Sequence, residues 1–362
     1  MSIHSKISDL IRKRIESGEY PPGGKIDSLR TLASQFSASP EVIRLALDLL
    51  RKEGLIISRH GKGNYVVENP VSTREVLVLA PLEGHINRDI VTEFIARFSQ
   101  HPECRLLLED VTLDDGNLDP AYVERRSNEL RQLIDERMLN GKLDAVFFNG
   151  SSRVSLSFLK EYLNRLKLFC FSDISQLVEV PCPSVSIDYY HGYYIALHHL
   201  FDIGCREIMV IGYPANATGI YSFHGELLET TAREECEAAG IRLHYCVNDK
   251  EEAIRTLKKN PGIDGIFSHA DNRLCQLFKA LPQLGRDPGR DLALVGFFHT
   301  PWAEYFSPTL TSVDIRLESI VDQVIQMYFS KGELKTFVKK IRPKLVLGES
   351  TLNFRPKKKR KN

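Results

Sequence analysis

Two kinds of residue in this 362-residue chain could do chemistry by their type and position. The run Arg59-His60-Gly61-Lys62-Gly63 places two cations and a histidine beside glycines. Glycine has no side chain, so backbone there can approach a phosphate or enter a groove. Upstream, Ser39-Pro40 is typical of a helix start, whose free N–H groups and positive dipole end attract phosphate. Both features indicate nucleic-acid binding at the beginning of the chain.

The second kind consists of polar and aromatic side chains that follow predicted strands in the rest of the chain. Ligands of parallel sheets bind beyond the carboxyl ends of the strands. Hydrogen-bonding candidates at such positions are His85, Asn87, Asn149 and Asp173, and Tyr213 and Trp302 offer stacking surface. They predict a site for a small polar molecule, although each could instead be a loop residue satisfied by its neighbours.

Helical periodicity predicts three short helices to position the first group. The first carries Ile7, Leu10, Ile11 and Ile15 on one face and stops before Gly18. The second is opened by Asp27 or Ser28. The third begins at Ser39 and ends at Gly54, with a predicted buried stripe of Val42, Leu45, Ala46, Leu49 and Leu50. Strands at 55–58 and 64–67 then flank the basic run as a hairpin.

Three helices with a tight turn between the last two, followed by a basic hairpin, predict a winged helix-turn-helix. Its third helix is long enough to lie in a major groove. The alternative is a three-helix bundle that packs on another part of the chain. The glycines of the hairpin favour DNA binding, because glycine weakens a plain hairpin.

From residue 75 apolar strand runs alternate with helical stretches. The strand candidates are 76–81, 105–110, 144–150, 167–173, 207–214, 241–247, 264–271 and 292–298, with helices such as 87–99, 121–139 and 189–202 between them. Continuous apolar strands separated by amphipathic helices predict an α/β fold with a doubly wound parallel sheet. A break near 181–186 predicts two similar lobes with a cleft between them.

Charge is distributed unevenly along the chain. Residues 1–70 hold 11 basic against 8 acidic residues, and 355–361 add six basic residues. The stretch 71–354 is acidic, with 31 basic against 39 acidic residues. Basic ends on an acidic body fit a head that faces nucleic acid. Neither a membrane-spanning run nor a signal peptide is predicted, and seven scattered cysteines fit reduced thiols in the cytoplasm.

Residues 7–67 resemble the DNA-binding head of the GntR family of bacterial regulators. The resemblance lies in SLRTLASQF, SPEVIRLALDLLRKEGLI and RHGKGNYV. It implies DNA contacts by Arg30, Ser39, Glu41, Arg44, His60 and Gly61, to which we add Arg59 and Lys62 of the basic hairpin. Pro40 and Glu41 depart from the residues common in the family at those positions. Proline cannot read a base and Glu41 can only accept hydrogen bonds, so we expect an unusual operator.

The body resembles the LacI/GalR effector domain, which has the periplasmic-binding-protein-like fold. The matching stretches span 184–320 and include VSIDYYHGYYIALHHL, GIDGIFSHADN and DLALVGFFHTPW. The resemblance implies that Asp271 accepts from sugar hydroxyls or holds a hinge. The family's usual aspartate is replaced by Phe298, with His299 next, and its usual arginine has no counterpart near Phe223 and His224. We therefore expect the pocket to be unusual. A GntR-type head on such a body is the arrangement of the arabinose-repressor-like regulators.

Other chemistries find no support in the sequence. Glycine-rich nucleotide loops, a nucleophile elbow and HExxH are absent, and adjacent His198 and His199 point to different helix faces. We expect no enzyme activity, no cofactor and no metal. The tail PKKKRK copies a nuclear-import signal, but in a chain of this bacterial character we interpret it as a disordered end that attracts DNA weakly.

The predicted organisation is a winged helix-turn-helix at 1–68, a linker at 69–74, a two-lobed ligand-binding domain at 75–354 and a basic tail at 355–362. The predicted function is a cytoplasmic, dimeric regulator, in the first place a repressor. Its affinity for double-stranded operator DNA would depend on a sugar-like molecule bound between the lobes. Alternatives are an activator or co-repressed regulator of the same architecture, and a cytosolic sugar-binding or sugar-processing protein.

Overall fold

The computed structural model describes residues 3–59, 61–67, 74–112, 119–139, 141–150, 156–172, 180–213, 220–247, 249–330 and 336–355. The chain divides into two compact units, Met1–Arg74 with His101–Arg105, and Glu75–Gln100 with Leu106–Asn362. Most of the predicted linker and of the basic tail lies outside the described residues. Within the described residues, no helix combines the length and apolar character needed to cross a membrane.

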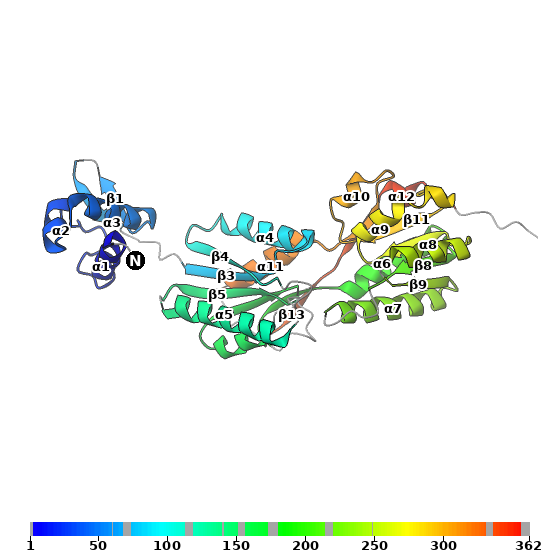
Figure 1. Cartoon of the computed structure of the whole chain (residues 1–362), viewed down its shortest axis with the longest axis horizontal. Helices are drawn as coiled ribbons and strands as arrows, with labels where there is room; N and C mark the ends of the chain where they lie inside the picture. Colours follow the sequence, from blue (N-terminus) through cyan, green and yellow to red (C-terminus); the bar gives the residue numbers. More distant parts are fainter. Residues whose placement is uncertain are drawn as a thin grey trace, which may run out of the picture. The chain divides into compact units, whose positions relative to one another are not determined.

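The first unit has the predicted winged helix-turn-helix fold (Figure 1). Its helices are α1 (Ile3–Glu16), α2 (Leu29–Gln35) and α3 (Pro40–Lys52), followed by the antiparallel strands β1 (Ile56–Arg59) and β2 (Gly63–Val66). The predicted helix starts are confirmed. Ser28 Oγ accepts from the backbone N–H of Thr31 at 3.1 Å, and Ser39 Oγ accepts from that of Val42 at 3.3 Å.

The predicted buried stripe of α3 is right at Ala46 and Leu50 and wrong at its other three positions. The buried residues are Ile43, Ala46, Leu47 and Leu50, whereas Leu45 is 41% exposed and Val42 and Leu49 are only half-buried. Both sets are apolar and keep helical spacing, so the sequence pattern could not choose between them. On α1, Leu10 is likewise exposed, although it was expected on the buried face with Ile7 and Ile11.

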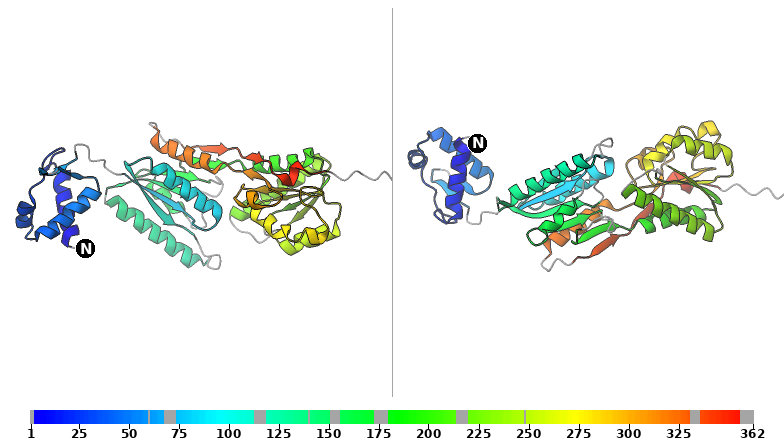
Figure 2. Two further views of the ribbon diagram at one scale, coloured as in Figure 1. Left: turned by 90° about the horizontal axis from the view of Figure 1, so that it is seen from above. Right: turned by 60° about the horizontal axis from the view of Figure 1, so that its bottom comes forward.

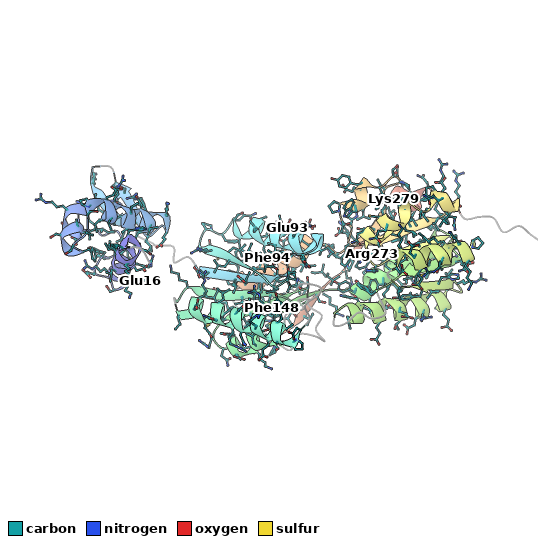
Figure 3. All side chains as sticks on the ribbon, in the orientation of Figure 1. Glu16, Glu93, Phe94, Phe148, Arg273 and Lys279 are labelled. Atoms are coloured by element: carbon teal, nitrogen blue, oxygen red, sulfur yellow. The ribbon has the colours of Figure 1, made fainter. Side chains whose placement is uncertain are left out.

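The first lobe of the second unit is built on a six-stranded sheet in the order β13-β7-β6-β5-β3-β4. Its strands are β3 (Arg74–Ala80), β4 (Cys104–Asp110), β5 (Leu143–Asn149), β6 (Lys167–Phe171), β7 (Ser184–Ile187) and β13 (Val338–Ile341). Consecutive side chains of β5 pack on opposite faces of the sheet. The Phe147 ring lies 5.5 Å from that of Phe94 on α4 (His85–Phe98), and Phe148 packs with Leu130 of α5 (Pro120–Leu139) (Figure 3).

The second lobe has a matching sheet in the order β14-β12-β11-β10-β8-β9. Its strands are β8 (Glu207–Ile211), β9 (Arg242–Cys246), β10 (Gly265–Ser268), β11 (Ala293–Phe297), β12 (Thr311–Asp314) and β14 (Lys344–Val346). All run parallel except β14, which pairs antiparallel to β12. Its helices are α6 (Tyr189–Asp202), α7 (Ile220–Ala238), α8 (Lys250–Lys259), α9 (Asp271–Phe278), α10 (Trp302–Tyr305) and α12 (Glu349–Leu352) (Figure 2). The predicted doubly wound architecture is confirmed.

The lobes are not two successive halves of the sequence, as the predicted break at 181–186 implied. That segment leads into β7 of the first sheet, and the chain then enters the second lobe at α6. It returns to the first lobe with α11 (Leu317–Phe329), where Arg97 of α4 donates to Asp322 at 2.5 Å, and with β13 beside β7. It ends in the second lobe with β14 and α12. Three connections therefore join the lobes.

Candidate functional site

A cavity of about 430 Å³ is lined by residues that follow strands of both lobes of the second unit. The first lobe contributes the loop after β3, the start of α4 and Ser172 after β6, and the second contributes the ends of β8, β10 and β11. This is the position expected for the ligand site of a doubly wound sheet. The residues that line it are Pro81, Glu83, Gly84, Ile86, Asn87, Ile90, Val111, Thr112, Ser172, Ile187, Tyr189, Tyr213, His224, His269, Ala270, Asp271, Asn272, Arg273, Phe298, Thr300, Trp302 and Ile315.

The structure brings about half of the predicted ligand residues together in this cavity. Those that line it are Asn87, Tyr213, His224, Asp271, Phe298 and Trp302. Asn149, Phe223 and His299 are not among the lining residues, and Asn149 is buried at the end of β5. His85 is the first residue of α4. Asp173 lies outside the described residues.

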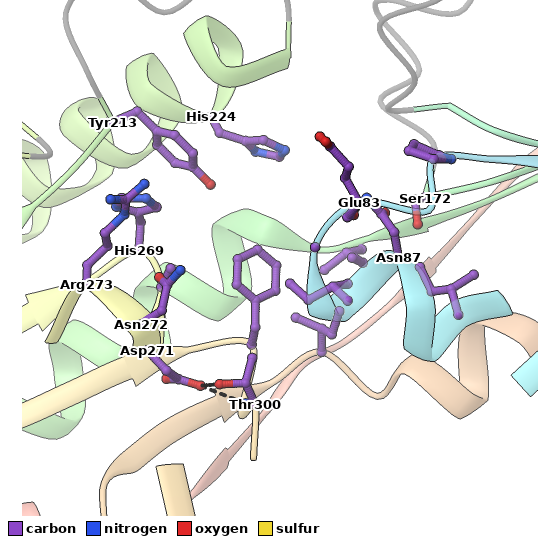
Figure 4. A pocket seen from close by; sticks show the side chains of 18 of the residues that line it. Glu83, Asn87, Ser172, Tyr213, His224, His269, Asp271, Asn272, Arg273 and Thr300 are labelled. Carbon is purple, nitrogen blue, oxygen red and sulfur yellow. Dashed lines mark hydrogen bonds between the residues drawn. The ribbon is translucent and has the colours of Figure 1, made fainter. Parts of the chain in front are cut away.

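Asp271 is fully buried, and its carboxylate is occupied by protein groups. Oδ2 accepts from the backbone N–H of Thr300 at 2.7 Å and from its hydroxyl at 2.9 Å (Figure 4). Oδ1 accepts from Ser312 Oγ at 2.7 Å. Gly296 makes room for it, because a Cβ there would lie 2.0 Å from Oδ1. Of the two roles expected for this aspartate, the geometry favours the structural one.

The same hydrogen bonds fix a turn that presents Phe298 to the cavity. Phe298 and His299 follow β11 with φ of 87° and 46°, a region that residues with side chains seldom adopt. The backbone N–H of His299 donates to Ser312 Oγ at 3.0 Å, and Ser312 in turn donates to Asp271. A buried network thus holds a turn that the sequence could not reveal.

Two buried histidines give the cavity a polar but uncharged wall. Burial lowers the pKa of both His224 and His269 to about 4, so both are neutral near pH 7. His269 Nδ1 lies 3.0 Å from the carbonyl oxygen of Ile211, which assigns the proton to Nδ1 and leaves Nε2 as an acceptor. The rings of Tyr213 and Tyr189 lie 4.0 Å from His269 and 4.1 Å from His224, respectively.

The cavity also contains polar residues that the sequence reasoning missed. They are Glu83, Thr112, Ser172, His269, Asn272, Arg273 and Thr300. Asn272 and Arg273 directly follow Asp271 at the start of α9, so the rule that ligands bind beyond strand ends could have found them. Glu83 precedes the start of α4, beside the predicted His85 and Asn87. Among the residues the structure describes, no group of three or more potential metal ligands is present.

The head presents a second candidate site, the exposed faces of α2, of the start of α3 and of the hairpin. Arg30, Ser39, Glu41, Arg44, Arg59, Gly61 and Lys62 are all exposed, and His60 lies outside the described residues. Arg44 Nη2 lies 2.6 Å from Glu41 Oε1, so these two residues, both predicted to contact DNA, form an ion pair with each other. The Arg59 guanidinium lies 4.6 Å from the centre of the Tyr65 ring, and Gly61 has a φ of 69° that permits the tight turn.

Two family models match separate parts of the chain. Residues 3–66 match the model described as bacterial regulatory proteins, gntR family, and residues 197–351 match the periplasmic binding protein-like domain. The chain is 23% identical to the arabinose metabolism transcriptional repressor of Geobacillus stearothermophilus, over 93% of this chain and 94% of that protein. It is 26% identical to the ribose operon repressor of Halalkalibacterium halodurans, over 69% and 75%.

Solved structures share the fold of the second unit. A LacI family transcriptional regulator from Arthrobacter sp. FB24, in complex with lactose, superposes with a TM-score of 0.60 at 18% identity, over 77% of this chain and 99% of that one. A lac repressor dimer bound to operator and the anti-inducer ONPF gives 0.58 at 16% identity, over 77% and 94%. Both likenesses concern the fold.

Proposed function

Because this chain joins a GntR-type winged helix-turn-helix to a periplasmic-binding-protein-like domain, we propose that it is a transcriptional repressor controlled by a sugar or sugar derivative. One observation carries the proposal. The same chain holds an exposed basic reading surface on its head and a polar cavity with aromatic walls between the lobes of its body. The arabinose and ribose repressors support it, since the first matches this chain over nearly its whole length.

We propose that the repressor acts on operator DNA as a homodimer. A single head reads only a few base pairs, so a pair of heads on a pseudo-palindromic site supplies both affinity and register. The operator-bound dimer among the structural neighbours supports this assembly. On the head, Arg44 and Glu41 would read bases in the major groove, while Arg30, Arg59 and Lys62 would bind phosphates.

The proposed organisation assigns residues 1–68 to DNA binding, 69–74 to a linker, 75–354 to ligand binding and 355–362 to a basic tail. In the cavity the proposed ligand contacts are Asn87, His224, Phe298 and Trp302, together with Asn272 and Arg273 of α9. Three connections between the lobes allow a ligand to draw them together while each sheet stays intact. A coupling free energy of about 1–3 kcal/mol changes operator affinity roughly 5- to 150-fold.

We also propose that the protein works by binding alone and acts in the cytoplasm, where its DNA target lies. The transcriptional relatives support a regulator and not an enzyme. The cavity agrees with this view, because the Asp271 carboxylate is committed to three hydrogen bonds and is poorly placed to move protons.

Selection of binding sites from random duplex DNA with the full chain tests the proposal. We expect enrichment of a symmetric site, and weaker binding to that site when the ligand is added. Enrichment with tighter binding on addition of ligand would indicate a co-repressed regulator. Failure to enrich any symmetric site would contradict the proposal and favour a sugar-binding protein whose head serves association only.

A further inference from the structure

We propose that the ligand of this cavity carries a carboxylate that pairs with Arg273, so that the effector is a sugar acid and not a neutral sugar. The inference rests on the proposed function and names the ligand class for the same site. Its starting point is a cation in the cavity wall that no described residue neutralises.

Arg273 lies in the first turn of α9, and its side chain lines the cavity beside His269 (Figure 4). Within the described part of the chain its guanidinium has neither a hydrogen-bond acceptor nor a carboxylate partner. Its charge reaches the inner wall, since it contributes to the lowered pKa of His269, after the larger effect of burial. The cation is therefore directed toward the site and free to bind a ligand.

The acid that could have paired with Arg273 is committed elsewhere. Asp271 stands two residues away, but both of its oxygens accept from Thr300 and Ser312. The two histidines of the wall are neutral near pH 7, so Arg273 is the one full positive charge among the described lining residues. A ligand that covers it removes water from the guanidinium, which is costly without an anion. A carboxylate supplies one in bidentate geometry.

The other polar groups of the cavity suit hydroxyls. His224 is 97% buried and its Nδ1 has no hydrogen-bond partner in the described residues, so it offers a fixed contact to the ligand. Asn272 and Asn87 add amide groups, one from each lobe. The ring of Phe298 provides an apolar surface for the C–H face of a sugar.

Glu83 selects a carboxylate over a phosphate. It lines the cavity from the first lobe, and its carboxylate has no ion-pair partner in the described residues. It can accept from hydroxyls, but it repels added negative charge. A monoanion balances Arg273 alone, whereas a dianionic sugar phosphate would leave a second charge near Glu83. Glu83 is not paired with Arg273 in this structure, so both remain available to the ligand.

Calorimetric titration of the full chain tests the inference with defined probes. The acids are D-glucuronate, D-galacturonate, D-gluconate and L-arabinonate, compared with glucose, galactose and arabinose and with glucose 6-phosphate. We expect one acid to bind about 100-fold more tightly than its neutral parent, because the acid would cover the guanidinium with a charge partner. Arg273→Gln should remove that preference. Arg290→Gln is the matched control, because Arg290 lies in the same lobe with its side chain 80% exposed. This variant should keep the preference for the acid.

Several results would overturn the inference. They are equal or tighter binding of the neutral parent, preference for the phosphate, binding of none of the acids, or an Arg273→Gln variant that keeps the preference for the acid. DNA selection run on the same preparation separates this failure from that of the proposed function. A symmetric site without an acid ligand removes only the sugar-acid inference. The absence of any such site removes the proposed function itself.

Discussion

The Asp271 carboxylate accepts two hydrogen bonds from Thr300, one from the backbone N–H at 2.7 Å and one from the hydroxyl at 2.9 Å. The pair joins the start of α9 to the loop between β11 and α10. That loop carries Phe298 and leads to Trp302, and both residues line the cavity. The two hydrogen bonds therefore hold one wall of the cavity in place. Asp271 thus supports the ligand site through Thr300 and Ser312.

Removal of this carboxylate should destabilise the second lobe. Asp271→Ala leaves the buried Ser312 hydroxyl and the half-buried Thr300 N–H without this acceptor, at about 1–3 kcal/mol for each fully buried group. We expect the free energy of unfolding to fall by about 2–4 kcal/mol in urea titrations followed by Trp302 fluorescence. Thr300→Ala, which removes only the hydroxyl donor, should cost about 1 kcal/mol. Equal stabilities of Asp271→Ala and the wild type would show that the network does not hold the loop.

The buried histidines should make stability fall with acidity. Burial depresses the folded-state pKa of His269 to about 4, below the ordinary value of about 6.5 of the unfolded chain. Protons therefore favour the unfolded state, so the contribution is present above pH 6.5 and is lost as the pH falls toward 4. For one histidine the loss from pH 7 to pH 5 is about 2 kcal/mol.

His269→Gln tests this linkage, because glutamine keeps hydrogen-bonding capacity but does not titrate. The variant should lose about 2 kcal/mol less than the wild type between pH 7 and pH 5 in urea titrations. His198→Gln is a suitable control, since His198 is partly exposed and lies 2.9 Å from Glu235, away from the cavity. An unchanged pH dependence in His269→Gln would mean that His269 is protonated in the folded protein at pH 5.

Continuous apolar runs were enough to predict most of both sheets. β8 and β11, for example, lie within the predicted ranges because their residues are buried on both faces. The predicted ranges left out the buried strands β7 and β12. They also left out β13 and β14, which are short edge strands with three lysines among their seven residues. These two edge strands bring the end of the chain back to each sheet. Long-range pairing of that kind leaves no local pattern, so the predicted separation of the lobes was too simple.

About half of the predicted ligand residues line the cavity, but the structure of its wall was not predicted. The rule that ligands bind beyond strand ends led to Asn87 and Tyr213, and the family resemblance led to Asp271; all three line the cavity. It could not show that Asp271 turns its oxygens toward Thr300, because the turn depends on positive φ angles at Phe298 and His299. Arg273 lies next to Asp271 but was missed. The sequence could not show that Asp271 binds Thr300 and Ser312 and so leaves the Arg273 charge available to a ligand.

Arg44 should be necessary for operator recognition. Its side chain is 61% exposed on α3 and paired with Glu41, at a position where an arginine can bind guanine. We expect Arg44→Ala to weaken binding of the selected operator by about 1–3 kcal/mol and to relax preference at one base pair, measured by fluorescence anisotropy at fixed salt. Arg51→Ala is the matched control. Arg51 forms the same kind of pair with Asp48 at the other end of this helix.

The two variants separate base reading from general attraction. Loss of a phosphate contact would weaken all duplexes alike and lower the salt dependence of binding. We expect Arg44→Ala to discriminate poorly between operator and scrambled DNA, while Arg51→Ala stays close to the wild type. Equal effects of both substitutions would assign Arg44 to the helix surface and not to sequence recognition.

The single tryptophan of the chain should report occupancy of the cavity. Trp302 begins α10, lines the cavity and is 43% exposed, so it is partly in contact with water. A ligand that fills the cavity covers the indole and moves it into a less polar environment. We expect a blue shift of the emission maximum that saturates with the dissociation constant measured by calorimetry. The response should remain in Arg44→Ala and weaken in Arg273→Gln at the same concentration of acid ligand, because only the second substitution alters the cavity. Emission that does not change while calorimetry records binding would place the ligand outside this cavity.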